Sequence, residues 1–422
     1  MTQFNHREVK LEEAIEAYLC SPEGGFIKGS DKNFDARLAL DTQTLLSFVK
    51  STQPKAWERY QVIYGSDCDR RFIKRFCEEV EADGLIQVLR HGIKDRGVNF
   101  IVAYFAPETS INPDLAVRYK SNILHCVRQF HYSPSDTQNT IDIVLLLNGI
   151  PIAALELKDE FSGQNVDDAI YQYKKDRDPR DPIFAFNQRL LVYFALDLAQ
   201  VFMTTQLAGA ATYFLPFNQG SNGAGEVGGK GNPPNPDNFM TAYLWENVLR
   251  KDRLMEILQK YIHLDVKKDG RKSIIFPRYH QLDVVTKLLA DVKANGTGKN
   301  YLIQHSAGSG KSNSIAWLAH RLSGLHDAND KKIFNSVIVV TDRKVLDSQL
   351  QDTVYQFDHV RGVVKKVEKN SKELLQAIND RIPIIITTLQ KFPVIFEQIK
   401  AGGRRFAIIW DEAHSSQTGE AA

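Results

Sequence analysis

Apolar residues dominate segment 141–158, in two runs separated by an Asn-Gly pair at 148–149. An Asn-Gly pair between runs of β-branched and aliphatic residues is a strong signal for a tight hairpin, so the pattern predicts two adjacent buried strands. Three charged residues, Asp142, Glu156 and Lys158, nevertheless lie in this stretch. Charged side chains are rarely fully buried unless they are paired, so the three residues form either an ion-paired cluster or a site.

Strand geometry decides whether these three side chains can meet. Glu156 and Lys158 are two positions apart, so both point to one face, about 6.6 Å apart along the strand. A two-residue loop would pair residue 142 with 155 and turn Asp142 away from Glu156. A three-residue loop would pair residue 142 with 154 and place all three charges on one face. A shared site therefore requires an odd-length loop or a β-bulge.

Two carboxylates and one ammonium group on one face suit the hydrolysis of a phosphodiester with a divalent metal ion. Asp142, Glu156 and the Leu157 carbonyl would hold Mg²⁺, and Lys158 would orient or activate the attacking water. The competing interpretation is an ion pair at a strand edge. The three residues alone do not decide between these two readings.

Two other segments have distinct patterns. Residues 218–238 are rich in Gly, Asn and Pro and lack an apolar period, which indicates a flexible loop or linker. A GxGxxG match at 223–228 is discounted, because prolines follow where a dinucleotide site needs a helix. Residues 242–262 carry apolar side chains at spacings of three and four, which predicts an amphipathic helix joining two halves of the chain.

The second half of the chain contains the pattern of a phosphate-binding loop. A short apolar strand is predicted at 301–303, followed by the loop AGSGKS and a helix. Lys311 would reach the β and γ phosphate oxygens of ATP, and Ser312 would ligate Mg²⁺. A similar pattern, GTGK at 296–299, precedes the strand and lacks a following Ser or Thr, so it is discounted. The predicted phosphate-binding residues are Gly308, Ser309, Gly310, Lys311 and Ser312.

An acidic motif follows about a hundred residues later. The apolar run at 406–410 predicts a strand, and DEAH comes directly after it. Asp411 would hold Mg²⁺ through water, and Glu412 would polarise the water that attacks the nucleotide.

Composition narrows the possible classes of protein only modestly. The length of 422 residues, with 43% hydrophobic and 25% charged residues, fits two or three ordinary globular domains. There is no signal peptide pattern and no run of 18 apolar residues, so no membrane association is expected. The four cysteines lack CxxC spacing, which favours a reducing cytoplasm. With a net charge of +2, DNA binding would need local basic patches.

The second half resembles superfamily 2 helicases and translocases, whose ordered motifs are matched by AGSGKS, VIVVTDRKVLDSQL, IIITTLQKF and WDEAH. FPRYHQLDVV resembles the adenine-recognising segment of that family, which implies base contacts from Gln281 and Arg278. The resemblance also implies residues that line the DNA track, namely Thr341, Asp342, Arg343, Thr387, Thr388 and Gln390.

A charged hairpin followed by a linker and a DEAH motor resembles the endonuclease and motor (R) subunit of type I restriction-modification enzymes, the HsdR family. Asp142, Glu156 and Lys158 then match the PD-(D/E)xK nuclease motif. Glu12 matches an acidic helical residue near that site, although Glu13 and Glu16 fit the sequence equally well. The QxxxY motif of the family is met only in part, because Tyr173 is present but Ala169 occupies the position of the Gln.

The expected fold is α/β, with a restriction-endonuclease-like domain at 1–235, a helical linker at 236–270 and a first RecA-like lobe at 271–422, the second lobe being absent. The resemblance implies ATP-dependent translocation of double-stranded DNA coupled to Mg²⁺-dependent cleavage, with methyltransferase and specificity subunits as partners, in a bacterial or archaeal cytoplasm. The alternatives are a DNA-repair helicase-nuclease and a nucleotide-gated DNA-binding module with an inactive nuclease. The sequence leaves the recognised DNA site open.

Overall fold

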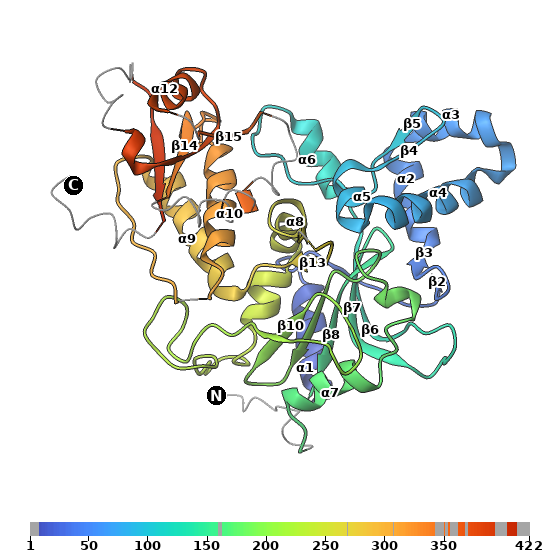
Figure 1. Cartoon of the computed structure of the whole chain (residues 1–422). Helices are drawn as coiled ribbons and strands as arrows, with labels where there is room; N and C mark the ends of the chain where they lie inside the picture. Colours follow the sequence, from blue (N-terminus) through green and yellow to red (C-terminus); the bar gives the residue numbers. More distant parts are fainter. Residues whose placement is uncertain are drawn as a thin grey trace. The chain divides into compact units, whose positions relative to one another are not determined.

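The computed structural model describes residues 8–158, 163–267, 269–306, 308–341, 350, 353–354, 362–367, 370–392 and 403–411. The chain forms two compact units (Figure 1), one comprising 1–107 and 112–278 and the other comprising 108–111 and 279–422. The expected linker at 236–270 therefore lies inside the first unit, which extends to Arg278. Both units combine helices and sheets, and the second contains a parallel sheet, so the chain is mixed α/β.

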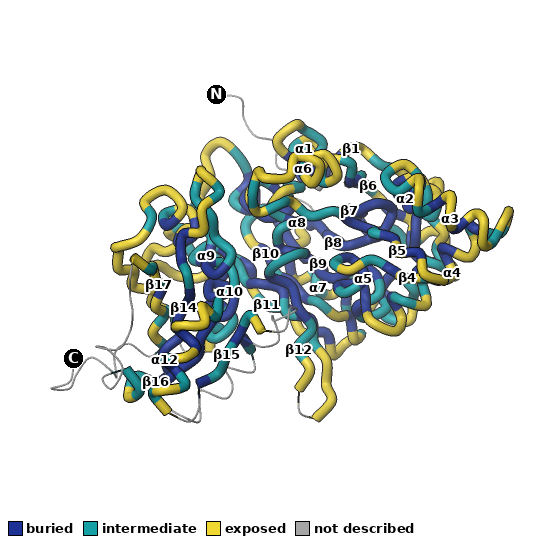
Figure 2. Tube along the Cα trace, turned by 90° about the horizontal axis from the view of Figure 1, so that it is seen from above, coloured by how far each residue is buried: buried dark blue, intermediate teal, exposed yellow. Residues whose placement is uncertain are grey.

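The first unit is built on a seven-stranded mixed sheet. Its strands in spatial order are β1 (Ile27–Lys28), β6 (Leu124–His131), β7 (Thr140–Leu147), β8 (Ile150–Leu157), β9 (Val192–Leu196), β10 (Val201–Thr204) and β11 (Leu215–Pro216). The pairs β1–β6 and β8–β9 are parallel, and the other neighbours are antiparallel. Strands β7 and β8 are buried almost throughout (Figure 2), as their continuous apolar runs predict.

Helices and three small hairpins complete the first unit. The hairpins are β2 (Phe34–Asp35) with β3 (Leu40–Asp41), β4 (Ile93–Asp95) with β5 (Val98–Phe100), and β12 (His263–Val266) with β13 (Lys272–Ile275). The helices are α1 (Glu8–Leu19), α2 (Thr42–Thr52), α3 (Pro54–Tyr64), η1 (Gly65–Asp67), α4 (Cys68–Asp83), α5 (Leu85–His91), α6 (Pro113–Lys120), α7 (Val166–Lys175), η3 (Pro182–Phe184), η4 (Leu244–Leu249) and α8 (Lys251–Lys260).

The single amphipathic helix predicted at 242–262 is divided in the structure. A π-helical segment, η4, ends before Arg250, whose ψ of 146° is extended, and α8 begins at the next residue. The Lys251 N–H donates to the carbonyl of Gly24 at 2.8 Å, so a contact within the first unit replaces the continuation of one helix. The prediction of one helix was therefore wrong, because apolar spacing cannot anticipate a tertiary hydrogen bond to the backbone.

The Gly-rich segment 218–238 also lies in the first unit. Backbone hydrogen bonds close it into a loop, with the Gly220 N–H donating to Gly231 at 2.8 Å and the Ser221 N–H donating to Gly229 at 3.0 Å. No helix follows the GxGxxG match directly, whereas a dinucleotide-binding turn opens a helix.

The second unit holds a four-stranded parallel sheet among its described residues, in the order β15-β16-β14-β17. These strands are β14 (Ser336–Thr341), β15 (Val364–Lys366), β16 (Ile384–Thr388) and β17 (Phe406–Trp410). Its helices are α9 (Tyr279–Asn295), α10 (Lys311–Ser323), α12 (Ser371–Asn379) and the short η5 (Leu389–Lys391). None of the helices that the structure describes is long and apolar enough to cross a membrane.

The strand predicted at 301–303 does not form. Tyr301 and Leu302 are exposed, and the Tyr301 hydroxyl donates to Asp291 Oδ2 at 2.5 Å. Ile303 is exposed as well, and segment 301–303 pairs with neither of the strands at the edges of the described sheet, β15 and β17. A run of three apolar residues also provides little surface to bury.

Candidate functional site

A β-bulge sets the register of the charged hairpin. Asn148 and Gly149 form a two-residue turn with φ values of 51° and 83°. Leu146 pairs with Pro151, but Leu145 pairs with Ala153, so one extra residue, Ile152, is accommodated in β8. The sequence required an odd loop or a bulge for a shared site, and the bulge confirms this prediction.

The turn at the end of this hairpin is buried instead of projecting into solvent. Asn148 is fully buried, its Oδ1 accepts from the Ile123 N–H at 2.7 Å, and its Nδ2 donates to the Val102 carbonyl at 2.8 Å. A Cβ at Gly149 would lie 2.3 Å from the Asp41 carbonyl oxygen. The turn is therefore fixed by the surrounding chain, and the register of the hairpin is fixed with it.

The bulge brings the three charged residues together. The Leu157 N–H donates to Asp142 Oδ2 at 2.7 Å, which ties Asp142 to the strand segment that carries Glu156 and Lys158. Exposure is 8% for Asp142, 0% for Glu156 and 9% for Lys158. The charges of Asp142 and Lys158 both act on Glu156. The three side chains thus form one buried charged cluster.

Arg177, which follows α7, is part of this cluster and was not predicted from the sequence. Its Nε and Nη2 both donate to Glu156 Oε1, at 2.8 and 2.6 Å. The pair is buried, with side-chain exposures of 4% for Arg177 and 0% for Glu156. No sequence signal identifies Arg177, because it lies 21 residues from Glu156 and outside the family motif.

The second oxygen of Glu156 is left for another ligand. Glu156 Oε2 is buried and has no hydrogen-bond partner among the residues that the structure describes. Burial raises the pKa of Glu156 well above its ordinary value, and the Asp142 charge raises it further, against the opposing effects of Arg177 and Lys158. A cation next to Oε2 would favour the ionised carboxylate. An unpaired buried oxygen beside a second carboxylate fits a divalent metal ion.

The ligand set for such an ion would be small. Within the described ranges, no group of three His, Cys, Asp or Glu side chains is arranged to hold a metal. Asp142 and Glu156 would supply the carboxylates, and a backbone carbonyl and water would complete the shell, as magnesium commonly requires.

Glu12 is the one of the three acidic candidates in α1 that reaches this site. It is 4% exposed, and it accepts from Arg128 Nε at 2.9 Å and from Gln129 Nε2 at 2.8 Å. Burial, together with the Asp142 charge, raises the pKa of Glu12 despite the opposing effect of Arg128. Glu13 is exposed, and Glu16 pairs with Lys28 at 2.8 Å.

Gln129 connects Glu12 to the charged cluster. Its Nε2 lies 2.8 Å from Glu12 Oε1 and 3.4 Å from Asp142 Oδ1, and its Oε1 accepts from Thr140 Oγ1 at 3.2 Å. Gln129 has a φ of 48°, in the left-handed region that residues with a side chain rarely adopt. Strained backbone that positions a polar side chain is frequent at functional sites. No sequence pattern identifies Gln129 as part of the site.

The partly matched QxxxY helix packs behind the cluster. Tyr173 is fully buried in α7, and its hydroxyl donates to the Phe194 carbonyl at 3.3 Å. Ala169 is also fully buried and belongs to the hydrophobic core of the first unit. A glutamine at this position would therefore place its amide against this hydrophobic core.

The phosphate-loop pattern begins a helix, as predicted. Gly308 and Gly310 have φ values of 71° and 83°, and α10 begins at Lys311 directly after them. A Cβ at Gly310 would lie 2.5 Å from Gln281 Nε2, so a side chain cannot be accommodated without movement. Ser312 lies in the first turn of α10, where backbone N–H groups favour a phosphate.

Gln281 contacts the loop itself in this structure. Its Nε2 donates to the carbonyls of Ser309 and Gly310 at 3.2 and 3.0 Å, and the residue is 3% exposed. Gln281, for which the resemblance implies an adenine contact, therefore also contacts the phosphate loop directly. Arg278, the other implied base contact, is half-buried at the end of the first unit.

The remaining motor residues lie at the ends of parallel strands. Asp411 follows β17, and its N–H donates to the Val340 carbonyl at 3.0 Å. Thr341 and Thr388 are paired positions at the ends of β14 and β16. Both threonines are buried, as is Thr387, whereas Gln390 is exposed, so among the described residues of this set it is Gln390 that presents its side chain at the surface. Asp342, Arg343, Glu412 and His414, the last residue of DEAH, lie outside the described residues.

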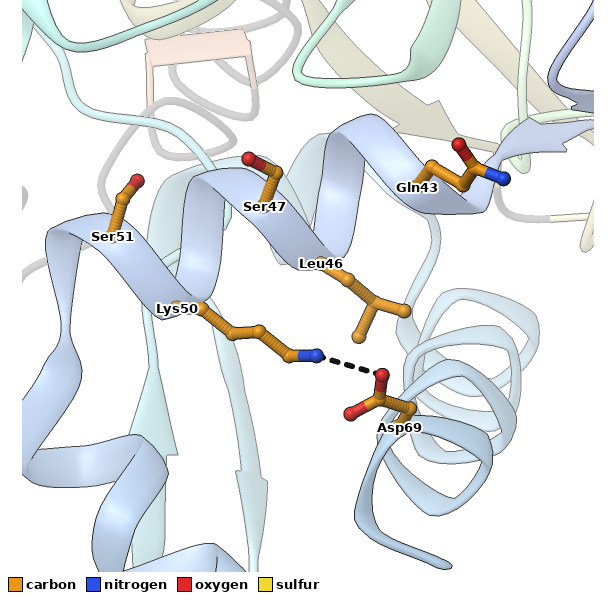
Figure 3. A pocket seen from close by; sticks show the side chains of 6 residues that line it. All are labelled: Gln43, Leu46, Ser47, Lys50, Ser51 and Asp69. Atoms are coloured by element: carbon orange, nitrogen blue, oxygen red, sulfur yellow. Dashed lines mark hydrogen bonds and ion pairs between the residues drawn. The ribbon is translucent and has the colours of Figure 1, made fainter.

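A separate hollow of about 610 Å³ lies beside α2 (Figure 3). Lys50 Nζ and Asp69 Oδ2 form an ion pair across it at 2.7 Å. The other lining residues are Gln43, Leu46, Ser47 and Ser51. None of the predicted site residues lines this hollow, so it is distinct from the charged cluster and the phosphate loop.

Comparisons with known proteins match the two units separately. The family described as Type I restriction enzyme R protein N terminus (HSDR_N) matches residues 69–212, and the family described as SWI2/SNF2 ATPase matches residues 280–422. The first match contains Asp142, Glu156 and Lys158, and the second contains the phosphate loop and DEAH. The fold and site thus combine a nuclease-like and an ATPase-like domain in one chain.

Curated relatives of this chain are named as endonuclease subunits of type I restriction enzymes. A Methanocaldococcus jannaschii protein named as the MjaVIIIP endonuclease subunit of a type I restriction enzyme is 23% identical over 400 residues, covering 85% of this chain and 35% of that protein. The Staphylococcus aureus (strain COL) SauCOLORF180P endonuclease subunit is 25% identical over 288 residues, covering 66% and 28%. The chain is therefore HsdR-like, and it spans about a third of the length of these relatives.

Proposed function

We propose that this chain is the endonuclease and first motor segment of a type I restriction subunit, which couples ATP-dependent translocation of double-stranded DNA to endonucleolytic cleavage. The observation that carries the nuclease part is the β8 bulge, which brings Asp142, Glu156 and Lys158 into one buried cluster and leaves Glu156 Oε2 without a partner. The relatives named as restriction endonuclease subunits support restriction over DNA repair.

In this proposal Asp142 and Glu156 hold Mg²⁺, which supplies Lewis-acid stabilisation of the phosphodiester and lowers the pKa of water. Lys158 holds the attacking water, or stabilises the developing charge, from the same strand as Glu156. Glu12 is a supporting carboxylate that Gln129 links to Asp142. Tyr173 supports the cluster by packing in α7.

The motor part rests on the second unit, which we assign as a first RecA-like lobe. Gly308, Ser309, Gly310 and the first turn of α10 form the phosphate cradle, with Lys311 for the β and γ oxygens. Ser312 and Asp411 would hold Mg²⁺, and Glu412 would polarise water. DNA would run past the ends of β14 and β16, along Asp342, Arg343 and the exposed Gln390, while the buried Thr341 and Thr388 would support this track from the strand ends. Methyltransferase and specificity subunits would supply modification and site recognition.

The decisive experiment compares Asp142→Asn and Glu156→Gln with wild type in the longer subunit, assembled with the methyltransferase and specificity subunits. DNA cleavage should be lost, while DNA-stimulated ATP hydrolysis stays near wild type, because the ligands of the nuclease metal are separate from the phosphate loop. Glu13→Gln is the matched control, since Glu13 is an exposed carboxylate of α1.

Melting temperature separates this proposal from a purely structural cluster, and Asp142→Asn is the variant that decides it. Glu156→Gln removes the buried partner of Arg177 and should cost about 3 to 5 kcal/mol under either interpretation. Loss of ATPase and cleavage together, in step with unfolding of the first unit, would refute the nuclease assignment.

A further inference from the structure

Arg177 binds only one of the two oxygens of Glu156. Its Nε and Nη2 converge on Oε1 at 2.8 and 2.6 Å, instead of each taking one oxygen. A guanidinium facing a carboxylate often binds both oxygens through parallel hydrogen bonds. Here the arrangement leaves Oε2 buried and without a partner among the described residues.

The position of Arg177 is fixed from several sides. Nη2 also donates to the Thr140 carbonyl at 2.6 Å, and the guanidinium lies over the Tyr132 ring, 5.5 Å from its centroid. Its side chain is 4% exposed. Moving the guanidinium away from Oε1 would break these contacts and leave a buried charge unpaired, so Oε1 stays occupied when an ion approaches Oε2.

A carboxylate restricted to one oxygen distinguishes between divalent ions. Mg²⁺ requires a compact octahedral shell at about 2.0 to 2.1 Å, and one carboxylate oxygen occupies one of its six positions. Ca²⁺ takes roughly 6 to 8 oxygens and often uses both oxygens of a carboxylate. Mn²⁺ shares the octahedral oxygen coordination of Mg²⁺.

We propose that Arg177 is a positioning residue that sets metal selectivity: by holding Oε1 it makes Glu156 a one-oxygen ligand, which favours Mg²⁺ and Mn²⁺ over Ca²⁺. This inference rests on the proposed function, because it assumes that Glu156 binds the catalytic ion. It adds to that function a residue and a property that neither the family motif nor the sequence supplies.

Selectivity is measured on the purified 422-residue chain without DNA or nucleotide. Mn²⁺ is titrated and free Mn²⁺ is followed by electron paramagnetic resonance, with Mg²⁺ and Ca²⁺ as competitors. The binding that disappears in Glu156→Gln defines the site. In Arg177→Met the ratio of Mg²⁺ to Ca²⁺ affinity at that site should fall by about fivefold or more, because Oε1 becomes available to Ca²⁺. A ratio cancels effects of charge and protonation that act equally on both ions.

Two further variants control for folding. Arg177→Lys keeps a positive charge but loses the two-donor fork, so the ratio should fall in this variant also. Arg189→Met removes another buried guanidinium, whose hydrogen bonds go to the carbonyls of Leu38, Ala39 and Gln188 and to Cys77 Sγ, and it should lower the melting temperature without changing the ratio.

The outcomes separate this inference from the proposed function. An unchanged ratio in both Arg177 variants, with binding lost in Glu156→Gln, would overturn the role of Arg177 and leave the nuclease proposal standing. If wild type and Glu156→Gln bound Mn²⁺ equally, both the role of Arg177 and the nuclease proposal would be overturned. A preference of the wild-type site for Ca²⁺ over Mg²⁺ would also overturn the inference, whatever the variants show.

Discussion

The carboxylate of Asp142 accepts a hydrogen bond from the backbone N–H of Leu157, with 2.7 Å between Oδ2 and N. Leu157 lies between Glu156 and Lys158, so this bond fixes Asp142 against the strand that carries the other two charges. Because backbone atoms of β8 hold Asp142, its placement depends on the register of the hairpin more than on side-chain flexibility. The Ile152 bulge, which sets that register, therefore determines whether the site exists.

The left-handed backbone of Gln129 allows its side-chain role to be separated from its effect on stability. Gln129→Gly and Gln129→Ala both remove the amide that bridges Glu12 and Asp142, so both should reduce DNA cleavage by a similar factor. The Gly variant should be more stable than the Ala variant by about 1 kcal/mol, because only glycine adopts a φ of 48° without strain. Chemical denaturation measures the difference. Equal stabilities would contradict the backbone strain at position 129, and cleavage that follows stability would contradict the bridging role.

Restoring the family glutamine at position 169 should not improve this protein. Ala169 is fully buried among apolar core residues, so Ala169→Gln would overpack the core and bury an unpaired amide, at a cost of about 1 to 3 kcal/mol. Lys175→Gln, at an exposed position of the same helix, should change the free energy of unfolding by less than about 0.5 kcal/mol. Increased cleavage by Ala169→Gln at unchanged stability would show that the site accepts the missing motif residue.

The two GK sequences of the second unit provide a matched pair. Lys311→Ala should reduce ATP hydrolysis by the longer subunit by roughly a hundredfold or more, because it removes the charge that contacts the β and γ phosphates. Lys299→Ala should leave ATP hydrolysis near wild type, since Lys299 forms a surface ion pair with Asp291 at 3.2 Å. Thermal unfolding of the first unit should be unchanged in both. Near-wild-type hydrolysis by Lys311→Ala would refute the phosphate-loop assignment.

Asp31 at the edge of the sheet should make stability depend on acid pH. Burial raises its pKa, but hydrogen bonds from the His131 N–H and ring, at 3.0 and 2.6 Å, together with the His131 charge, outweigh burial and lower the pKa below 3.8. A lowered pKa stabilises the fold above pH 3.8, and this contribution is lost as the pH falls through the folded value. Asp31→Asn should thus lower the melting temperature at pH 6, with a difference that shrinks below pH 3.8.

The His131→Ala background tests this assignment. Without its partner, Asp31 should contribute little, so Asp31→Asn should have a smaller effect in that background at pH 6. A pH-independent effect of Asp31→Asn in the His131-containing protein would show that the contact does not depend on the carboxylate charge.

The chemistry of both candidate sites could be predicted from the sequence. The buried strands, the charged residues Asp142, Glu156 and Lys158, and the glycines before Lys311 all depend on local pattern: alternation along a strand, turn residues and backbone freedom. The alternation of side chains along the hairpin even defined the condition for a shared site, which is an odd-length loop or a β-bulge. Local patterns fail, however, at the strand predicted at 301–303 and at the helix interrupted by Arg250, because the ends of these elements depend on contacts with distant residues.

Only the tertiary structure decided how the cluster is completed. Three acidic residues of α1 fit the sequence equally well, and burial against Gln129 selects Glu12. Arg177 reaches Glu156 from 21 residues away because α7 packs on the sheet, and no residue spacing encodes that contact. The sequence specifies which groups can bind a metal ion or a phosphate. The packing of helices against strands, through long-range burial and hydrogen bonding, decides which oxygen atoms remain available to do so.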